Sequence, residues 1–158
     1  MKSISKNGLK LIKKHEGFRN HPYKDVKGIP TIGYGNTFYE DGTKVTMEDH
    51  PITKKRGEEL LKIIVNKFEV GVWENLEVEV NQNQFDALVS FAYNVGVSAF
   101  KYSTLLKKIN NDPNDFEAIK KQFKRWNKSG GKVYKGLEKR RNQEAYLYET
   151  PVDKNINN

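Results

Sequence analysis

Apolar residues at the start of the chain recur at helical spacing. Leu9, Ile12 and Glu16 fall at i, i+3 and i+7, so they share one helix face, and Gly17 follows directly. The pattern predicts a helix over residues 5–16 that stops at Gly17. Its apolar face directs Glu16 toward the interior of the protein rather than toward bulk water.

Residues 18–50 follow a different pattern. Glycines at positions 28, 33, 35 and 42 and prolines at 22 and 30 separate short runs of aromatic and β-branched residues. This punctuation is typical of tight turns between short strands. We therefore predict a small sheet of hairpins in this part of the chain.

Helical spacing returns after residue 53. The pattern predicts a long helix over 53–76, a nearly apolar and therefore buried helix over 84–93, and shorter helices over 103–110, 114–126 and 137–148, with a loop at 129–131. The fold class expected is α+β in a single domain spanning 1–158. It comprises a β-hairpin lobe (about 17–52), a long helix joining the lobes (about 53–76), a helical lobe (1–16 with 77–150), a cleft between the lobes and a loose tail (151–158).

Composition and charge narrow the function classes. The chain has 158 residues, of which 30% are charged and none is Cys, so no disulfide supports the fold. No apolar run is long enough for a signal peptide or a membrane span, and the lack of Cys fits a protein made in a cytoplasm. A monomer is the simplest expectation. The net charge of +8 favours polyanionic partners, but only five of the 28 basic residues are Arg, which argues against a specific nucleic-acid reader.

Two carboxylates and a hydroxyl carry the candidate chemistry. Glu16 and Asp25 are separated by eight residues, and Asp25 and Thr31 by five. A hairpin centred on Gly28 would place Asp25 opposite Thr31, with Cβ atoms ~4.5–5.5 Å apart, where the two side chains could hold one water. Partial burial favours the protonated form of Glu16, as a general acid requires. Taken singly, Glu16 could instead form a helix-end ion pair, and the other two could be ordinary turn residues.

Such a set suits the hydrolysis of a glycosidic bond. One carboxyl group donates a proton to the leaving oxygen, and the other activates water or attacks the sugar. A Thr that helps to hold water favours direct attack and inversion. A carboxyl separation of ~6.5–9.5 Å would agree with inversion, and ~5–5.5 Å with a covalent intermediate.

At these residues the chain resembles the phage-type lysozymes, or endolysins, of glycoside hydrolase family 24. The spacing of Glu16, Asp25 and Thr31 matches the motif of that family, and the resemblance extends to about residue 150. Further matching segments are 32–37, 52–54, 87–96, 125–127 and the stretch 136–144, in which Gly, Leu, Arg, Arg and Glu recur at the family spacing.

The resemblance implies a lysozyme-like fold and a muramidase that cuts the β-1,4 bond between N-acetylmuramic acid and N-acetylglucosamine in host peptidoglycan. Glu16 would be the acid, and Asp25 and Thr31 would position water. The resemblance further implies that Arg141 or Arg140 pairs with the acid, and that substrate is bound by Tyr34, Thr37, Tyr93 and Asn94. Reaching the wall would require a separate membrane-permeabilising protein. No cofactor is implied.

Two alternatives to this hypothesis remain. A lytic transglycosylase or chitinase-like glycosidase could use the same carboxylates, and a basic protein could bind wall polymers without catalysis. A basic stripe is formed by Lys120, Lys121, Lys124, Arg125 and Lys128. Such a run is usually a solvated helix face, and the alternative is a surface that docks to an anionic wall. The three histidines show no metal-ligand spacing, so no metal site is predicted.

Overall fold

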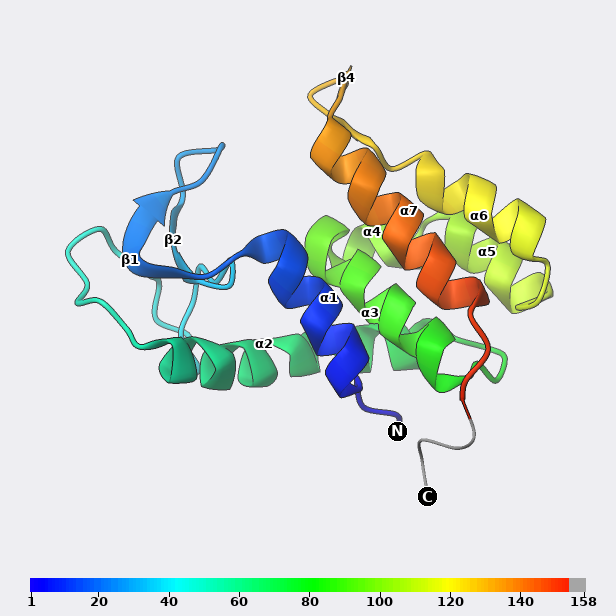
Figure 1. The fold of residues 1–158 in the computed structure, drawn as a ribbon, viewed down its shortest axis with the longest axis horizontal. Helices are drawn as coiled ribbons and strands as arrows, with labels where there is room; N and C mark the ends of the chain where they lie inside the picture. Colours follow the sequence, from blue (N-terminus) through cyan, green and yellow to red (C-terminus); the bar gives the residue numbers. More distant parts are fainter. Residues whose placement is uncertain (154–158) are drawn as a thin grey trace. The chain divides into compact units, whose positions relative to one another are not determined.

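The computed structural model describes residues 1–153. In chain order its elements are α1 (Lys6–Glu16), β1 (Arg19–Lys24), β2 (Pro30–Gly33), α2 (Lys54–Asn75), α3 (Gln82–Val95), α4 (Val97–Lys101), α5 (Thr104–Asn111), α6 (Phe116–Lys124), β3 (Lys128–Ser129), β4 (Lys132–Val133) and α7 (Lys135–Glu149) (Figure 1). No helix in this part of the chain is long and apolar enough to cross a membrane.

The chain divides into two compact units. Residues 10–67 form the hairpin unit, and residues 1–9 together with the described residues from 68 onward form the helical unit. Helices α1 and α2 each contribute residues to both units. The organisation as one domain stays a prediction, and the tail predicted to be loose lies, from residue 154 onward, outside the described residues.

The hairpin unit contains an antiparallel pair, β1 and β2, in which Tyr23 lies opposite Thr31 and Lys24 opposite Pro30. The backbone N–H of Asp25 donates to Ile29 O (3.0 Å), and Gly28 N–H donates to Asp25 O (2.9 Å). The turn therefore spans 26–28 and is centred on Lys27. Our prediction of a turn centred on Gly28 is wrong because a three-residue loop places its left-handed residue last, and Gly28 has φ +78°.

Beyond Gly33 the predicted sheet is reduced to two isolated bridges, Ile32 with Asn36 and Phe38 with Lys44. In this segment aspartate side chains accept hydrogen bonds from backbone N–H groups that would otherwise pair between strands. Asp41 Oδ1 accepts from the N–H of Thr43 (3.0 Å), and Asp49 Oδ2 accepts from the N–H of Thr46 (3.0 Å). Such local bonds compete with strand pairing, so the prediction of several hairpins is confirmed only for β1 and β2.

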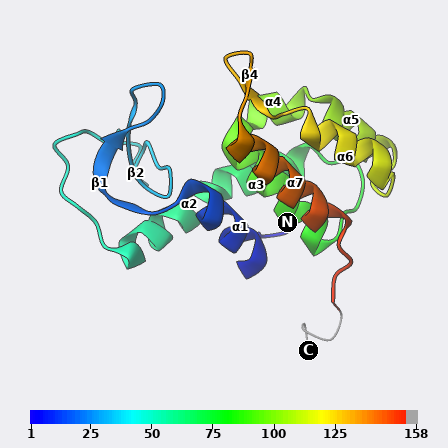
Figure 2. The same cartoon turned by 45° about the horizontal axis from the view of Figure 1, so that its top comes forward.

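The helical unit is built around α3, whose residues 84–92 are all buried. Helix α7 lies against α3 and also against α6 (Figures 1 and 2). The Phe91 ring makes edge contacts with Phe100, Phe123 and Trp126, at centroid distances of 6.3, 5.7 and 5.4 Å. An aromatic cluster thus fixes the positions of α3 and α6 within this unit.

The predicted helices are confirmed, with shifted ends that have local causes. Helix α3 begins two residues early because Asn81 and Gln84 form a capping box, with reciprocal bonds of 2.8 and 2.9 Å. Helix α6 begins at Phe116 rather than 114 because the Asp115 side chain caps it. The short helix α4 was not predicted, and the loop at 129–131 proves to be the turn of the small hairpin β3–β4.

Candidate active site

Glu16 is the last residue of α1, and its carboxyl group lies against Gly35. The helix ends where Gly17, at φ +70°, donates its N–H to Lys13 O (2.9 Å). A β-carbon at Gly35 would lie 2.6 Å from Glu16 Oε2 and 3.3 Å from its Cδ. Only a glycine lets the backbone approach the carboxyl group so closely. The half-buried Glu16 side chain is therefore placed by the helix end and by the turn after β2.

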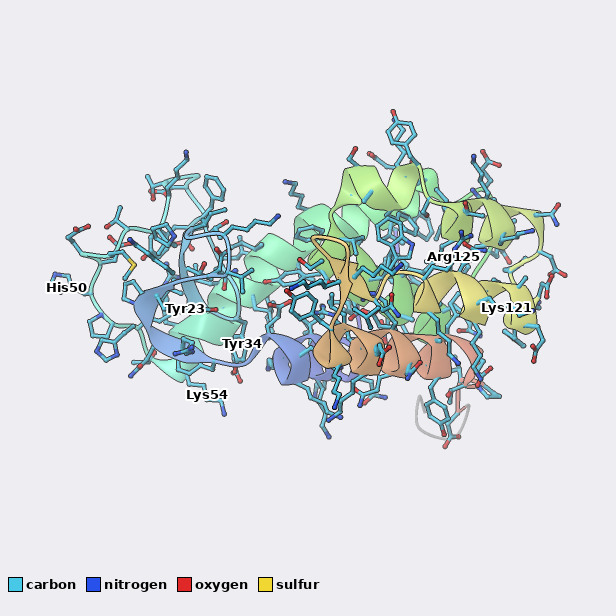
Figure 3. The ribbon with its side chains drawn as sticks, turned by 90° about the horizontal axis from the view of Figure 1, so that it is seen from above. Tyr23, Tyr34, His50, Lys54, Lys121 and Arg125 are labelled. Atoms are coloured by element: carbon cyan, nitrogen blue, oxygen red, sulfur yellow. The ribbon has the colours of Figure 1, made fainter. Side chains whose placement is uncertain are left out.

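The pKa of the Tyr23 hydroxyl responds to both carboxylates (Tyr23 is labelled in Figure 3). Burial raises the pKa of its hydroxyl first, the Glu16 carboxylate raises it next and Asp25 adds a smaller increase, while Arg19 lowers it. The Arg19 guanidinium stacks 4.5 Å from the centre of the Tyr23 ring. Glu16 and Asp25 therefore both lie close enough to the Tyr23 hydroxyl to affect its pKa.

Asp25 and Thr31 are both bonded to the turn that joins β1 to β2. Asp25 Oδ1 accepts from the backbone N–H of Lys27 (2.8 Å) and of Ile29 (2.9 Å), while Thr31 Oγ1 donates to Ile29 O (2.8 Å). Both bonds to Asp25 end on one oxygen, so Oδ2 can still accept a bond from water. Thr31 is buried, with 3% of the residue exposed, and its hydroxyl oxygen also retains acceptor capacity.

The observed register corrects the predicted geometry of this pair. Asp25 lies opposite Ile29, and Thr31 lies opposite Tyr23, so Asp25 and Thr31 are diagonal neighbours. Diagonal neighbours are ~7–8 Å apart, and their Cβ atoms, though somewhat closer than that, are farther apart than the ~4.5–5.5 Å of directly opposite residues. Since alternate residues share a face, Tyr23, Asp25 and Thr31 still lie on the same face of the hairpin.

Tyr34 and Thr37, predicted to bind substrate, follow β2. Tyr34 is only 3% exposed, and its ring packs 5.4 Å from that of Phe18, with Lys13 Nζ 5.9 Å from the ring centre. Thr37 is half-buried and accepts the backbone N–H of Val45. A ring as buried as that of Tyr34 supports the turn that carries Gly35.

In the helical unit, Glu144 holds the two predicted arginines. The carboxylate is fully buried and accepts from Ser90 Oγ (2.6 Å), from Arg140 Nε (3.2 Å) and from Arg141 Nη1. Arg140 Nη2 also donates to Ser90 O (3.0 Å), and Arg141 Nε donates to Trp126 O (2.9 Å). A buried carboxylate bonded to two guanidinium groups fixes the orientation of both.

Asn94 and Tyr93 belong to the same end of α3. Asn94 Oδ1 accepts from Arg141 Nη2, and the Asn94 residue is exposed. The Tyr93 ring packs 5.0 Å from that of Phe68 and is half-buried. The Arg141 guanidinium lies 4.9 Å from the centre of the Phe91 ring. Two of the predicted functional residues, Arg141 and Asn94, are therefore in direct contact.

Sequence reasoning missed three contributors. Tyr23 is two residues before Asp25 on the same strand, so the alternation of the strand was the available signal. Gly35 ends a Gly-Tyr-Gly segment, which suggests close backbone approach. Ser90 carried no signal, because a serine within an apolar helix is common. Within residues 1–153, no three His, Asp or Glu side chains are grouped so that they could hold a metal ion.

Comparisons with known proteins agree on one family. The family model described as phage lysozyme matches residues 13–144. The chain is 47% identical to the endolysin of Bacillus phage B103, over 98% of the chain and 57% of that protein, so it spans little more than half of that relative. It is 39% identical to the endolysin of Salmonella phage P22, over 92% of the chain and 97% of that protein. The structure of an endolysin from Escherichia coli O157:H7 phage FAHEc1 matches with a TM-score of 0.85 at 38% identity, covering 93% of each chain.

Proposed function

Because the chain belongs to the phage lysozyme family, we propose that it is a muramidase that lyses a bacterial host by hydrolysing peptidoglycan. The bond cut is the β-1,4 linkage between N-acetylmuramic acid and N-acetylglucosamine. One observation carries the assignment of the site: the Glu16 carboxyl group is held against the Gly35 backbone, in the unit that also contains Asp25 and Thr31.

Glu16 is the general acid in this proposal. Its half-buried carboxyl group donates a proton to the oxygen of the leaving sugar as the glycosidic bond breaks. The close backbone of Gly35 restricts where the carboxyl group can point. A donor held in place loses less freedom on reaching the transition state than a mobile one.

Asp25 and Thr31 position the attacking water. The free lone pairs of Asp25 Oδ2 and of the Thr31 hydroxyl can each accept one hydrogen of the same water. With the two side chains turned toward each other, their diagonal spacing leaves about 4 Å between the two oxygens, which one water can bridge. As this water attacks and inverts the anomeric centre, the Asp25 carboxylate takes the proton that the water loses. The backbone bonds to Asp25 Oδ1 fix the direction of this carboxylate.

The remaining assignments support the reaction. We propose Arg141 or Arg140 as the partner of the acid, and Thr37, Tyr93 and Asn94 as contacts to the glycan. Tyr34 is better placed to support the Gly35 turn than to touch sugar, since it is buried. Release to the wall by a separate membrane-permeabilising protein, and a monomeric state, stay predictions.

Product analysis tests the proposal. Purified peptidoglycan is digested with wild type, with Glu16→Gln and with the control Glu48→Gln, which changes an exposed carboxyl group of the same unit. We expect new reducing muramic acid ends from wild type and the control, and none from Glu16→Gln. Anhydro ends would instead identify a lytic transglycosylase. Wall binding without new ends from any of the three would identify a non-catalytic binder.

A further inference from the structure

Most of the net charge of the chain comes from one short segment. Residues 120–139 hold eight Lys or Arg and a single acid, Glu138, for a net charge of +7. The whole chain has 28 basic and 20 acidic residues, a net charge of +8, so the remaining 138 residues together contribute +1. A charge this concentrated creates a local positive potential that an evenly spread +8 would not.

These eight side chains lie on α6 and its C-terminal end, on the hairpin β3–β4 and on α7, which packs against α6, and we call them together the basic surface. Four of them lie on α6 or at its C-terminal end, and Lys128 follows on β3. Lys132 on β4 and Lys135 and Lys139 on α7 extend the surface beyond the stripe recognised in the sequence. All eight are exposed (Lys121 and Arg125 are labelled in Figure 3). Lys120, Lys121 and Lys124 span only about 100° of the α6 circumference.

Helices α6 and α7 share a groove within this region. A depression of about 290 Å³ is lined by Lys124 and Asn127 on one side and by Glu138 and Asn142 of α7 on the other. Glu117 lies on the same arc of α6 as the lysines. These two acids are the only carboxylates beside the basic surface in residues 116–142, so its potential stays positive.

Ion pairing within the protein does not offset this charge. In the part of the chain that the structure describes, none of the eight basic side chains forms an ion pair, whereas Arg56 at the start of α2 pairs with Glu40 and Glu59. Like charges without counterions repel one another and destabilise the surface that carries them. A bound polyanion would remove that repulsion.

The residue types indicate the kind of polyanion. Seven of the eight are Lys, a flexible point charge, and only Arg125 offers the fork that reads phosphate bidentately. Sequence-tolerant binding of single-stranded nucleic acid also uses rows of stacking aromatics. Here Trp126 packs against Phe91, which leaves Tyr134, 50% exposed, as the exposed aromatic of residues 120–139. The surface suits a flexible chain of repeated phosphates without bases.

We propose that the basic surface binds the phosphodiester polymers attached to the bacterial wall, of the teichoic acid type, and so holds the enzyme on its insoluble substrate. The choice of the wall as partner rests on the proposed function, but the binding itself does not require catalysis. Attachment lowers the rate at which the enzyme leaves the wall between cuts. It also makes binding steeply dependent on salt, because each polymer phosphate contacted releases a counterion.

A sedimentation assay tests this surface with protein that cannot digest the walls. In a Glu16→Gln background, Lys120→Glu/Lys124→Glu/Lys128→Glu is compared with the control Lys54→Glu/Lys55→Glu/Lys62→Glu. All six lysines are exposed, and both triple variants lower the net charge by six. Each protein is sedimented with intact walls and with the same walls chemically stripped of phosphodiester polymer. Thermal melting checks that each variant is folded.

We expect the basic-surface variant to bind intact walls at least tenfold more weakly than the control does. Stripping the walls should weaken binding of the parent protein by a similar factor, and so should raising salt from 0.05 to 0.2 M, by roughly the counterion release of three contacts. Equal losses in both triple variants, unchanged binding to stripped walls, or tighter binding to single-stranded DNA than to intact walls would overturn the proposal. These outcomes do not depend on product analysis, so the proposed function can stand or fall separately.

Discussion

Replacing Gly35 with alanine adds one methyl group beside the Glu16 carboxyl group. The new carbon would lie 2.6 Å from Oε2, and ordinary contact begins at 3.4 Å, so the oxygen must retreat by about 0.8 Å. Because this oxygen is the end of a flexible side chain, the carboxyl group can move while the fold is kept. The change therefore displaces the proposed acid without removing it.

Gly35→Ala should lower both the unfolding free energy and the turnover of the enzyme, and the two losses can be measured separately. Gly35 has φ +81°, and a residue with a β-carbon in this conformation costs roughly 1–2 kcal/mol of unfolding free energy. A shift approaching 1 Å in a catalytic group lowers turnover by up to about 100-fold, which is about 2.7 kcal/mol of transition-state stabilisation. Gly35→Ala should thus lose a little stability and most of its activity.

Gly42→Ala supplies the matched control. Gly42 has φ +86° and lies in the same unit, but a β-carbon there meets nothing within 4 Å. Urea unfolding measures the stability of both variants, and the initial rate of appearance of reducing ends from purified peptidoglycan measures turnover. We expect similar losses of stability and a loss of turnover in Gly35→Ala alone. Equal turnover in the two folded variants would refute the placement of Glu16 as the acid held by Gly35.

Three further predictions test other parts of the account. Asp25→Asn should leave thermal melting nearly unchanged, because an amide oxygen can still accept the two turn N–H groups, yet lower turnover by about 100-fold or more; a variant of normal turnover would exclude Asp25 from the site. Glu144→Gln leaves two buried arginines without their carboxylate and should lower the unfolding free energy in urea by about 3–5 kcal/mol, against about 1 kcal/mol for Ser90→Ala. Equal losses in the two variants would contradict the central role of the Glu144 carboxylate in this network. Burial raises the pKa of Asp86 above its usual value of 3.8, so the folded protein holds this proton more tightly than the unfolded chain does. As pH rises from 3.8 through the raised pKa, wild type should therefore lose unfolding free energy relative to Asp86→Asn, which urea unfolding across pH measures; a constant difference between the two proteins would contradict this.

The fold was largely predictable because its main elements have strong local signals. The helix that ends at Glu16 has an apolar face and a glycine stop, and α3 is apolar over almost its whole length. The comparisons confirm the lysozyme-like α+β fold, with a small N-terminal hairpin and a helical body. Short pieces such as α4 carry too few residues to show a period, and their formation depends on tertiary packing.

The hairpin register was mispredicted although its signal was present. We took Gly28 as the centre of symmetry, whereas a three-residue loop uses its last residue for the left-handed conformation. Counting back from Gly28 in this way gives Lys27 as the centre and makes Asp25 and Thr31 diagonal neighbours. One residue of error changed the expected distance between the two side chains while leaving them on the same face.

The burial of Arg140 and Arg141 could not be predicted from the sequence pattern alone. Arg140 and Arg141 follow a lysine in a highly charged helix, which is typical of an exposed surface, yet both are buried. Burial is possible because Glu144 lies three and four residues later and Ser90 bonds it from α3. The spacing to Glu144 was visible in the sequence, but the bond from Ser90 exists only in the folded protein.

The most direct measurement follows the anomeric configuration of the first product by NMR while wild type and Glu16→Gln digest a soluble peptidoglycan fragment. Our account predicts that the wild-type product appears first as the inverted anomer and that Glu16→Gln forms none on the same time scale. Retained configuration would make Asp25 a nucleophile rather than a residue that positions water. Normal product formation by Glu16→Gln would contradict the role of Glu16 as the acid.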